Sequence, residues 1–274
     1  PAVCPNDSRC EKVETVGTCG DEDPLQQDVG DPHVTTWDGK YYTSLHRGEF
    51  VRAVDVFDDS MEYQIRQEVI SGSPWAAVNT AVAVRVGEHV IEIDRIPHRL
   101  LIDGEEVSLP PGTYPVGDAT LTVQSKGYMI RFPAPNGSTT KLFVTLAGTA
   151  IPHLNISMST GKHGRYRGTL GIPDNHRAND FTTRDGQVVD DLGPFFESWR
   201  ITTLEESLFT YEDGKGPWTY NLDAAALPAY DYFGGNNPQG RNYIQEAADF
   251  YKVYCGASMN LAKDADFLIR SVAV

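Results

Sequence analysis

Apolar and polar residues alternate along much of the first 160 positions, in short runs separated by turn-forming residues. Within residues 119–125, Leu121 and Val123 alternate with Thr122 and Gln124. A period of two, in runs rich in Val, Ile, Thr and Tyr, is typical of β-strands. We predict strands at GEFVRAVDV (48–56), MEYQIRQEVI (61–70), TAVAVRV (80–86), HVIEID (89–94), ATLTVQS (119–125), YMIRF (128–132), TKLFVTL (140–146) and HLNISMS (153–159).

Many short strands joined by tight turns indicate a mainly β, antiparallel fold, either a sandwich or a partly open barrel. Asp103-Gly104 and Ser125-Lys126-Gly127 are typical turn sequences. The run at 89–94 departs from strict alternation, because Val90, Ile91 and Ile93 are all apolar.

Both ends of the chain differ from this pattern. Residues 1–28 are polar and cysteine-bearing, as expected of a linker or the tail of a small disulfide module. Residues 212–274 begin as a glycine-containing loop and then favour short helices. Asn237 and Pro238 are suited to start a helix. One apolar face would contain Tyr243, Ala247, Phe250, Tyr251 and Tyr254, with Gly256 at its end and a second short helix at 261–269.

Length and charge narrow the function classes. The 274 residues suffice for one large or two small domains. The net charge of −15, from 23 Lys+Arg and 38 Asp+Glu, argues against nucleic acid or an anionic membrane as a partner. It suits cation binding or solubility. No run approaches the ~20 apolar residues of a membrane span. Because Pro1 opens a polar stretch, we expect a mature chain or a fragment of a longer one.

The cysteines and glycosylation motifs favour a secreted or cell-surface protein. The four cysteines do not form a CxxC metal pattern, and their three pairings remain open. Sequons begin at Asn6, Asn136 and Asn155. The cysteines are Cys4, Cys10, Cys19 and Cys255.

Carboxylates and amides concentrate in the loop 168–186, at Asp174, Asn179 and Asp180, with His176 among them. Calcium binds six to eight oxygen atoms, and carboxylates supply the charge. An EF-hand register starting at Asp174 fails, because position 185 is Asp and position 179 is not Gly. By spacing alone, a solvated turn with Asx caps is the better explanation of these residues.

Several separated motifs occur in one order: GDPHVTTWDGKYY (30–42), GEFV (48–51), NTAVAVRVGEHVIEID (79–94), GTLGIPDNHRANDFTTRDG (168–186) and SWRI (198–201). Together they resemble the von Willebrand factor type D domain, in the variety found with EGF-like modules. The likeness covers residues 29–211 and implies a two-sheet β-sandwich with one structural Ca²⁺. Its implied ligands are the side chains of Asp38, Asp174, Asn179 and Asp180 and the backbone carbonyl of His176.

Two departures from the family pattern matter. Ile172 stands where the family usually has Asn, so that position offers only its carbonyl. Phe50 and Leu170 occupy two positions that are usually cysteine. If those cysteines normally form a disulfide, a buried Phe–Leu contact replaces it here. The low cysteine content makes disulfide-linked polymerisation through this domain unexpected.

The resemblance also implies self-cleavage between Asp31 and Pro32. The Asp31 carboxyl group would attack its own carbonyl carbon, and the proline nitrogen would leave. His33 would orient or protonate the site. The alternative is a plain turn, because the residue before a proline prefers the extended backbone that a strand start requires.

An enzyme is not indicated, because the chain has no GxSxG, HExxH or P-loop motif. The neighbouring pairs Glu105-Glu106 and Glu205-Glu206 are better explained as solvated charges. We therefore expect a non-enzymatic, extracellular or cell-surface calcium-binding module for adhesion or assembly, with extracellular proteins or matrix components as partners. The alternative is a carbohydrate-binding module that uses C-terminal aromatic residues, which would otherwise cover a sheet edge. These are Tyr211, Trp218, Tyr220, Tyr230, Tyr232 and Phe233.

Overall fold

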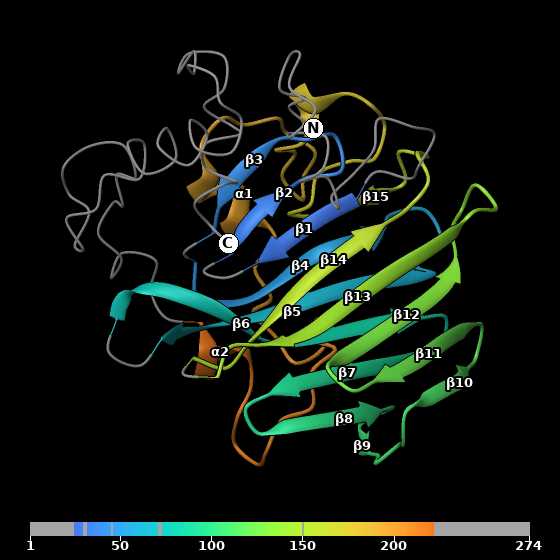
Figure 1. Cartoon of the computed structure of the whole chain (residues 1–274). Helices are drawn as coiled ribbons and strands as arrows, with labels where there is room; N and C mark the ends of the chain where they lie inside the picture. Colours follow the sequence, from blue (N-terminus) through green and yellow to red (C-terminus); the bar gives the residue numbers. More distant parts are fainter. Residues whose placement is uncertain (1–24, 30–31, 45, 71–72, 150, 222–274) are drawn as a thin grey trace, which may run out of the picture. The chain divides into compact units, whose positions relative to one another are not determined.

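The computed structural model describes residues 25–221, apart from 30–31, 45, 71–72 and 150. These residues belong to one compact unit that spans Asp23–Ala226. Within them the chain forms two antiparallel β-sheets that pack face to face (Figure 1). The expected mainly β, two-sheet sandwich is therefore confirmed.

The first sheet, sheet A, has the strand order β10-β11-β12-β13-β14-β1-β2-β3. Its strands are β1 (Leu25–Val29), β2 (His33–Thr35), β3 (Tyr41–Thr43), β10 (Gly112–Val116), β11 (Ala119–Gln124), β12 (Gly127–Pro133), β13 (Thr139–Ala147) and β14 (His153–Ser159).

The second sheet, sheet B, has the order β15-β4-β5-β6-β7-β8-β9. Its strands are β4 (Gly48–Asp55), β5 (Met61–Ile70), β6 (Ser73–Val86), β7 (His89–Arg95), β8 (His98–Ile102), β9 (Glu105–Glu106) and β15 (Tyr166–Arg167).

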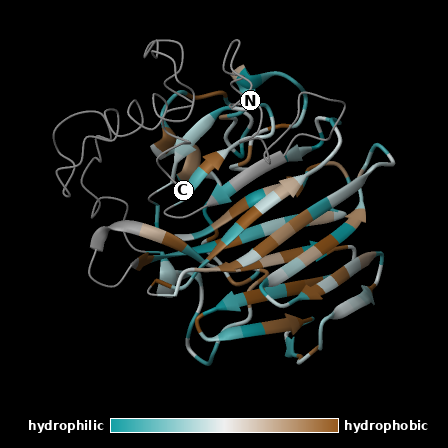
Figure 2. Cartoon of the chain, in the orientation of Figure 1, coloured by the Kyte–Doolittle hydropathy of each residue, from teal (hydrophilic) through white to brown (hydrophobic). Residues whose placement is uncertain are grey.

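The hydrophobic core lies between the two sheets. Sheet A contributes Leu121, Ile130 and Ile156, and sheet B contributes Ile65 and Val82, all at most 1% exposed. Hydropathy alternates along the strands as a period of two requires (Figure 2). Removing this apolar surface from water, at roughly 25 cal/mol per Å², is the main source of the fold's stability.

All eight strand runs expected from the sequence are strands in the structure. The strands that the pattern missed are β1 and several shorter strands, such as β2, β3 and β9. The sequence placed residues 1–28 in a separate segment, whereas the structure includes Leu25–Val29 in sheet A. A polar run such as LQQDV carries no apolar alternation to identify it.

Two short helices follow the strands: α1 (Leu192–Ser198) and α2 (Pro217–Tyr220). Asp191 caps α1 by accepting a hydrogen bond from the Gly193 amide. In α1, Phe195 and Phe196 are fully buried in the core. Short helices after the strands are thus confirmed. The helices expected at 238–256 and 261–269 lie outside the described residues.

Residues 206–211, which we call the cover segment, lie on the outer face of sheet B. The Leu208 amide donates to Gln64 Oε1 at 2.9 Å, and Phe209 packs on Ala81 and Ala83. This cover explains the broken alternation in β7, because Val90 packs with Phe209 and the alanines on the outer face. Ile91 and Ile93 face the core, while Glu92 and Asp94 are buried on the other side of the sheet.

Candidate functional site: two acidic loops in contact

The first loop is the turn between β2 and β3. The Gly39 amide donates to the Thr36 carbonyl at 3.1 Å, and the Lys40 amide donates to Thr36 Oγ1 at 2.7 Å. Gly39 has a φ of +83°, which glycine adopts without strain. The turn holds Asp38, half-buried, at the surface of the sandwich.

The second loop runs from residue 172 to 180 and ends in a short 3₁₀ turn, Arg177–Asn179. Asp174 organises it, because its carboxylate accepts from the His176 amide at 2.8 Å and from Asn179 Nδ2 at 2.8 Å. Asp174 and His176 are exposed, whereas Asn179 is half-buried. The His176 carbonyl, an expected calcium ligand, accepts a hydrogen bond from the Asn179 amide at 3.0 Å.

Asp38 joins the two loops across 136 positions of sequence. Its Oδ2 accepts from the Asp174 amide at 3.3 Å and from the His176 amide at 2.7 Å. Burial, and then the neighbouring Asp174 carboxyl group, raise the pKa of Asp38 above its ordinary value. The neighbouring carboxylates of Asp38 and Asp174 repel each other unless a proton or a cation lies between them.

Asp180 lies behind this pair and is fully buried. Its Oδ2 accepts from Thr36 Oγ1 at 2.6 Å and its Oδ1 from the Ile172 amide at 3.2 Å. Burial, and to a smaller extent the charge of Asp38, raise the pKa of Asp180 to about 6. Asp180 therefore also ties the two loops together, through hydrogen bonds that use both of its oxygens.

Two oxygen atoms make this place suitable for a cation. Asp38 Oδ1 and Asn179 Oδ1 are buried and have no hydrogen-bond partner. Buried acceptors of this kind call for an explanation, and a bound ion is one. Asn79, Glu92 and Asp94 also have one such oxygen each. Among the described residues, no group of three or more His, Cys, Asp or Glu is arranged to hold a metal. Calcium, unlike softer metals, takes amide and carbonyl oxygens as ligands in addition to carboxylates. Asp38 and Asn179 each keep a buried oxygen that could bind Ca²⁺. Asp174 and Asp180 both use their two carboxylate oxygens in hydrogen bonds, and Asp174 is the exposed one of the two.

The Asp31-Pro32 bond lies in the connection between β1 and β2. Asp31 is outside the described residues, and Pro32 is buried, with its carbonyl accepting from the Ser44 amide at 2.8 Å. His33 is held in place. Its Nδ1 lies 2.6 Å from Tyr41 Oη and 3.1 Å from Thr43 Oγ1, and its ring stacks on that of Tyr41.

Two of the expected glycosylation motifs can be placed. Asn136 lies in an exposed turn, where its Oδ1 accepts from the Ser138 amide at 3.1 Å. Asn155 is on β14, between the buried Leu154 and Ile156, and so faces away from the core. Asn6 and the four cysteines, Cys4, Cys10, Cys19 and Cys255, lie outside the described residues.

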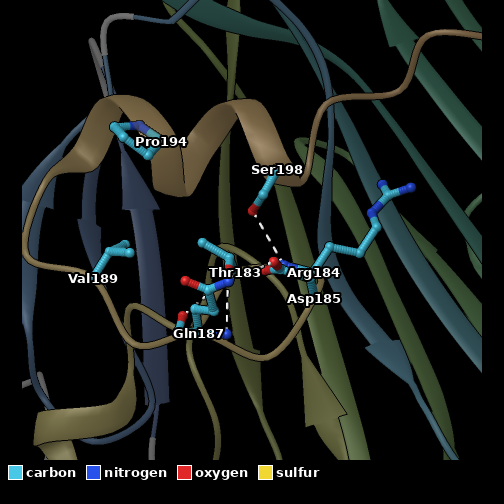
Figure 3. A pocket seen from close by; sticks show the side chains of 7 residues that line it. All are labelled: Thr183, Arg184, Asp185, Gln187, Val189, Pro194 and Ser198. Atoms are coloured by element: carbon cyan, nitrogen blue, oxygen red, sulfur yellow. Dashed lines mark hydrogen bonds between the residues drawn. The ribbon is translucent and has the colours of Figure 1, made fainter.

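Two hollows lie elsewhere on the sandwich. A surface hollow of about 650 Å³ lies between α1 and the turn 183–187 (Figure 3). Its hydroxyl groups are used locally: Thr183 Oγ1 donates to the carboxylate of Asp185, and Ser198 Oγ accepts from the Arg184 amide at 3.2 Å.

The second hollow, of about 340 Å³, lies between sheet B and the loop 210–220. Among its charged side chains, Arg99 pairs with Asp94 at 2.5 Å and Lys215 pairs with Glu212 at 2.7 Å.

The described C-terminal aromatic residues mainly pack on the protein itself. Tyr211 donates to Glu49 through its hydroxyl, and the ring of Tyr220 lies 3.9 Å from the Arg66 guanidinium carbon. Trp218 is exposed, at 56%. Tyr230, Tyr232 and Phe233 are outside the described residues. Tyr211 and Tyr220 are thus partly covered by other parts of the domain. A flat sugar-binding platform would need free ring faces.

Comparison with known proteins identifies the family. Residues 29–187, more than half of the chain, match the von Willebrand factor type D domain (VWD). The chain belongs to this family, whose domains are generally non-enzymatic modules of adhesion and assembly. It is also similar to zonadhesin of Sus scrofa, at 25% identity over 213 residues. That match covers 75% of this chain but only 8% of the relative. Among the described residues, no helix is long and apolar enough to cross a membrane.

Sequence reasoning did not single out Thr36, which holds Asp180, or the amides of the second loop, which hold Asp38. A threonine two positions before an acid carries no distinctive pattern. Backbone amides leave no mark in the sequence at all. The roles of Thr36 and of these amides depend on contact between the two loops, which only the fold brings about.

Proposed function

We propose that this chain is an extracellular module that uses Ca²⁺ to join two distant loops, and that it serves adhesion or assembly within a larger secreted or cell-surface protein. Family membership and the similarity to zonadhesin support an extracellular setting. The chain spans a small part of that relative, so its partners are proposed only by class: extracellular proteins or matrix components.

The observation that carries the calcium proposal is the pair of buried oxygens without partners, Asp38 Oδ1 and Asn179 Oδ1, beside the carboxylate of Asp174. Asp38, Asp174 and Asn179 would hold the ion, with carbonyl oxygens of the second loop and water completing its shell. Asp180 would position the loop from behind through Thr36 and Ile172. The ion would offset the repulsion between carboxylates and raise stability by mass action.

Calorimetric titration of the EDTA-treated protein with CaCl₂ tests this directly. We expect one site and a higher melting temperature with Ca²⁺. Asp174→Ala should remove both effects. Asp185→Ala is the matched control, because Asp185 is also an exposed loop acid but bonds only within its own turn, to Thr183 and Gln187. No heat of binding and an unchanged melting curve would refute the site.

Self-cleavage at Asp31-Pro32 is the second proposed property. The fixed orientation of His33 by Tyr41 and Thr43 supports it, because a proton donor to the proline nitrogen must be held in place. Cleavage should yield a fragment that begins at Pro32, seen by intact mass under denaturing conditions after incubation at about pH 6. A single full-length mass would exclude it.

The cysteines and sequons complete the proposal. Disulfides among Cys4, Cys10, Cys19 and Cys255, and glycans at Asn6, Asn136 and Asn155, would suit a secreted protein. The carbohydrate-binding alternative depends on the exposed Trp218 and on aromatic residues beyond residue 221. A glycan array with the whole chain and with Trp218→Ala separates the two functions.

A further inference from the structure

β1 is an interior strand of sheet A. It pairs antiparallel with β14 on one side, from Leu25 opposite Ser159 to Asp28 opposite Ile156. On the other side it pairs with β2, from Gln27 opposite Thr35 to Val29 opposite His33. Figure 1 shows it between these two strands. Its backbone groups are therefore used on both sides, and its removal would leave two unpaired strand edges inside the sheet.

The Asp28 side chain links β1 to the opposite sheet. It is fully buried, and its Oδ2 lies 2.6 Å from Arg52 Nη2 on β4. Its Oδ1 accepts from Asn79 Nδ2 on β6 at 2.9 Å. One carboxylate of sheet A thus contacts two strands of sheet B through the core.

Arg52 depends on this carboxylate. The guanidinium is fully buried, and its other contacts are with the neutral groups Thr169 Oγ1 at 3.0 Å and Tyr42 Oη at 3.3 Å. A buried cation that loses its counter-ion is strongly destabilising. The sandwich therefore holds β1 through a charge as well as through its backbone.

We infer that the sandwich binds β1 non-covalently, so that β1 stays in place after the chain is cut between Asp31 and Pro32. The binding slot is the space between β14 and β2, and its occupant is β1 of the same chain, recognised by strand pairing and by Arg52. A cut at this bond would then give a two-chain module rather than a released fragment. The inference gives the proposed self-cleavage a structural consequence but does not depend on it.

A protease site inserted into the full chain between Asp31 and Pro32 tests this without self-cleavage. After digestion, the protein is run on native size exclusion in a reducing agent, which removes any disulfide. We expect the two fragments to elute together and to separate only in denaturant. Separation of the wild-type fragments while residues 32–274 keep their β circular dichroism would overturn the inference.

Asp28→Asn tests the part played by the charge. It should increase the dissociation rate of the cut fragment on the order of a hundredfold or more. Glu49→Gln is the matched control, because it breaks another buried pair, Glu49–Arg66 at 2.7 Å, away from β1. Retention as tight in Asp28→Asn as in wild type would refute the role of Asp28.

Hydrogen exchange of the uncut wild type covers the case in which Asp28→Asn does not fold. Amides of β1 should exchange as slowly as those of β14. Fast exchange confined to β1 would show that the strand is not held and would overturn the inference.

Discussion

The Asp180 carboxylate occupies the space that a side chain on Gly171 would need. A Cβ placed on Gly171 would lie 2.3 Å from Asp180 Oδ1, and Gly171 has a φ of +81°. The same Oδ1 accepts from the Ile172 amide. The glycine therefore allows the buried acid to reach the start of the second loop.

We predict that Gly171→Ala destabilises the fold more than its backbone strain explains. A positive φ costs an alanine roughly 1–2 kcal/mol. Displacement of Asp180 would add roughly 1–3 kcal/mol for the hydrogen bonds lost. Gly186→Ala is the control, because Gly186 has a φ of +90° and open space at its Cβ position. Equal losses of unfolding free energy in urea would contradict the packing role of Gly171.

Thr36→Val should lower the free energy of unfolding by roughly 1–3 kcal/mol, because it leaves the buried Asp180 Oδ2 without its donor. Thr36→Ser keeps the hydroxyl and should recover most of the loss. Chemical denaturation of the three proteins measures the effect. A valine variant as stable as the wild type would show that Asp180 does not need this bond.

Removal of Ca²⁺ should loosen the second loop before the sandwich. Asp38 and Asp180 tie the loop 172–180 to the first loop, and repulsion between the carboxylates of Asp38 and Asp174 acts there first. Hydrogen exchange with EDTA should speed up in 172–180 and 36–40 while β4, β5 and β6 stay protected. Exchange that does not change with EDTA would contradict the calcium proposal.

Glu92 should make stability depend on pH near neutrality. Burial, and then the neighbouring Asp94, raise its pKa from 4.5 to about 7; Arg66 and the Thr210 amide partly oppose this, and Arg99 also faces it from β8. Because the folded-state pKa is the higher one, the folded chain holds the proton more tightly. The resulting stabilisation is complete below about pH 4.5 and is lost as pH rises through about 7.

Glu92→Gln should remove this dependence, since glutamine keeps an oxygen for the Thr210 amide. The wild type should lose roughly 1–3 kcal/mol between pH 5 and 8 beyond any loss in the variant. Urea denaturation at several pH values measures this. Parallel pH profiles for the two proteins would show that Glu92 is not the group responsible.

Phe50→Cys combined with Leu170→Cys should form a disulfide. Both residues are fully buried in one core, and the Leu170 amide donates to the Arg52 carbonyl at 3.1 Å, two residues from Phe50. Cα atoms about 4.4–6.8 Å apart permit the bond. Thiol titration and intact mass detect it. Two free thiols after oxidation would show that this pair does not stand in for a cystine.

The sequence by itself determined the class of fold. Period-two runs located the long strands, and their spacing and turns required an antiparallel β protein. Ordered motifs also identified the family and pointed to Asp38 and Asp174, which the structure brings into contact through the second loop's amides. These features are either local patterns of apolar and polar residues or sequence motifs that can be recognised without the fold.

Only the tertiary structure decided which distant polar groups meet. It placed β1 inside sheet A, paired Asp28 with Arg52, and set Asp180 against Gly171 and Thr36. It also buried Glu92 beneath the cover segment. The physical reason is that periodicity records which face of a strand is apolar, whereas a buried charge is stabilised by a specific partner. That partner is set by strand order and by the packing of one sheet on the other, and neither is written in the local pattern.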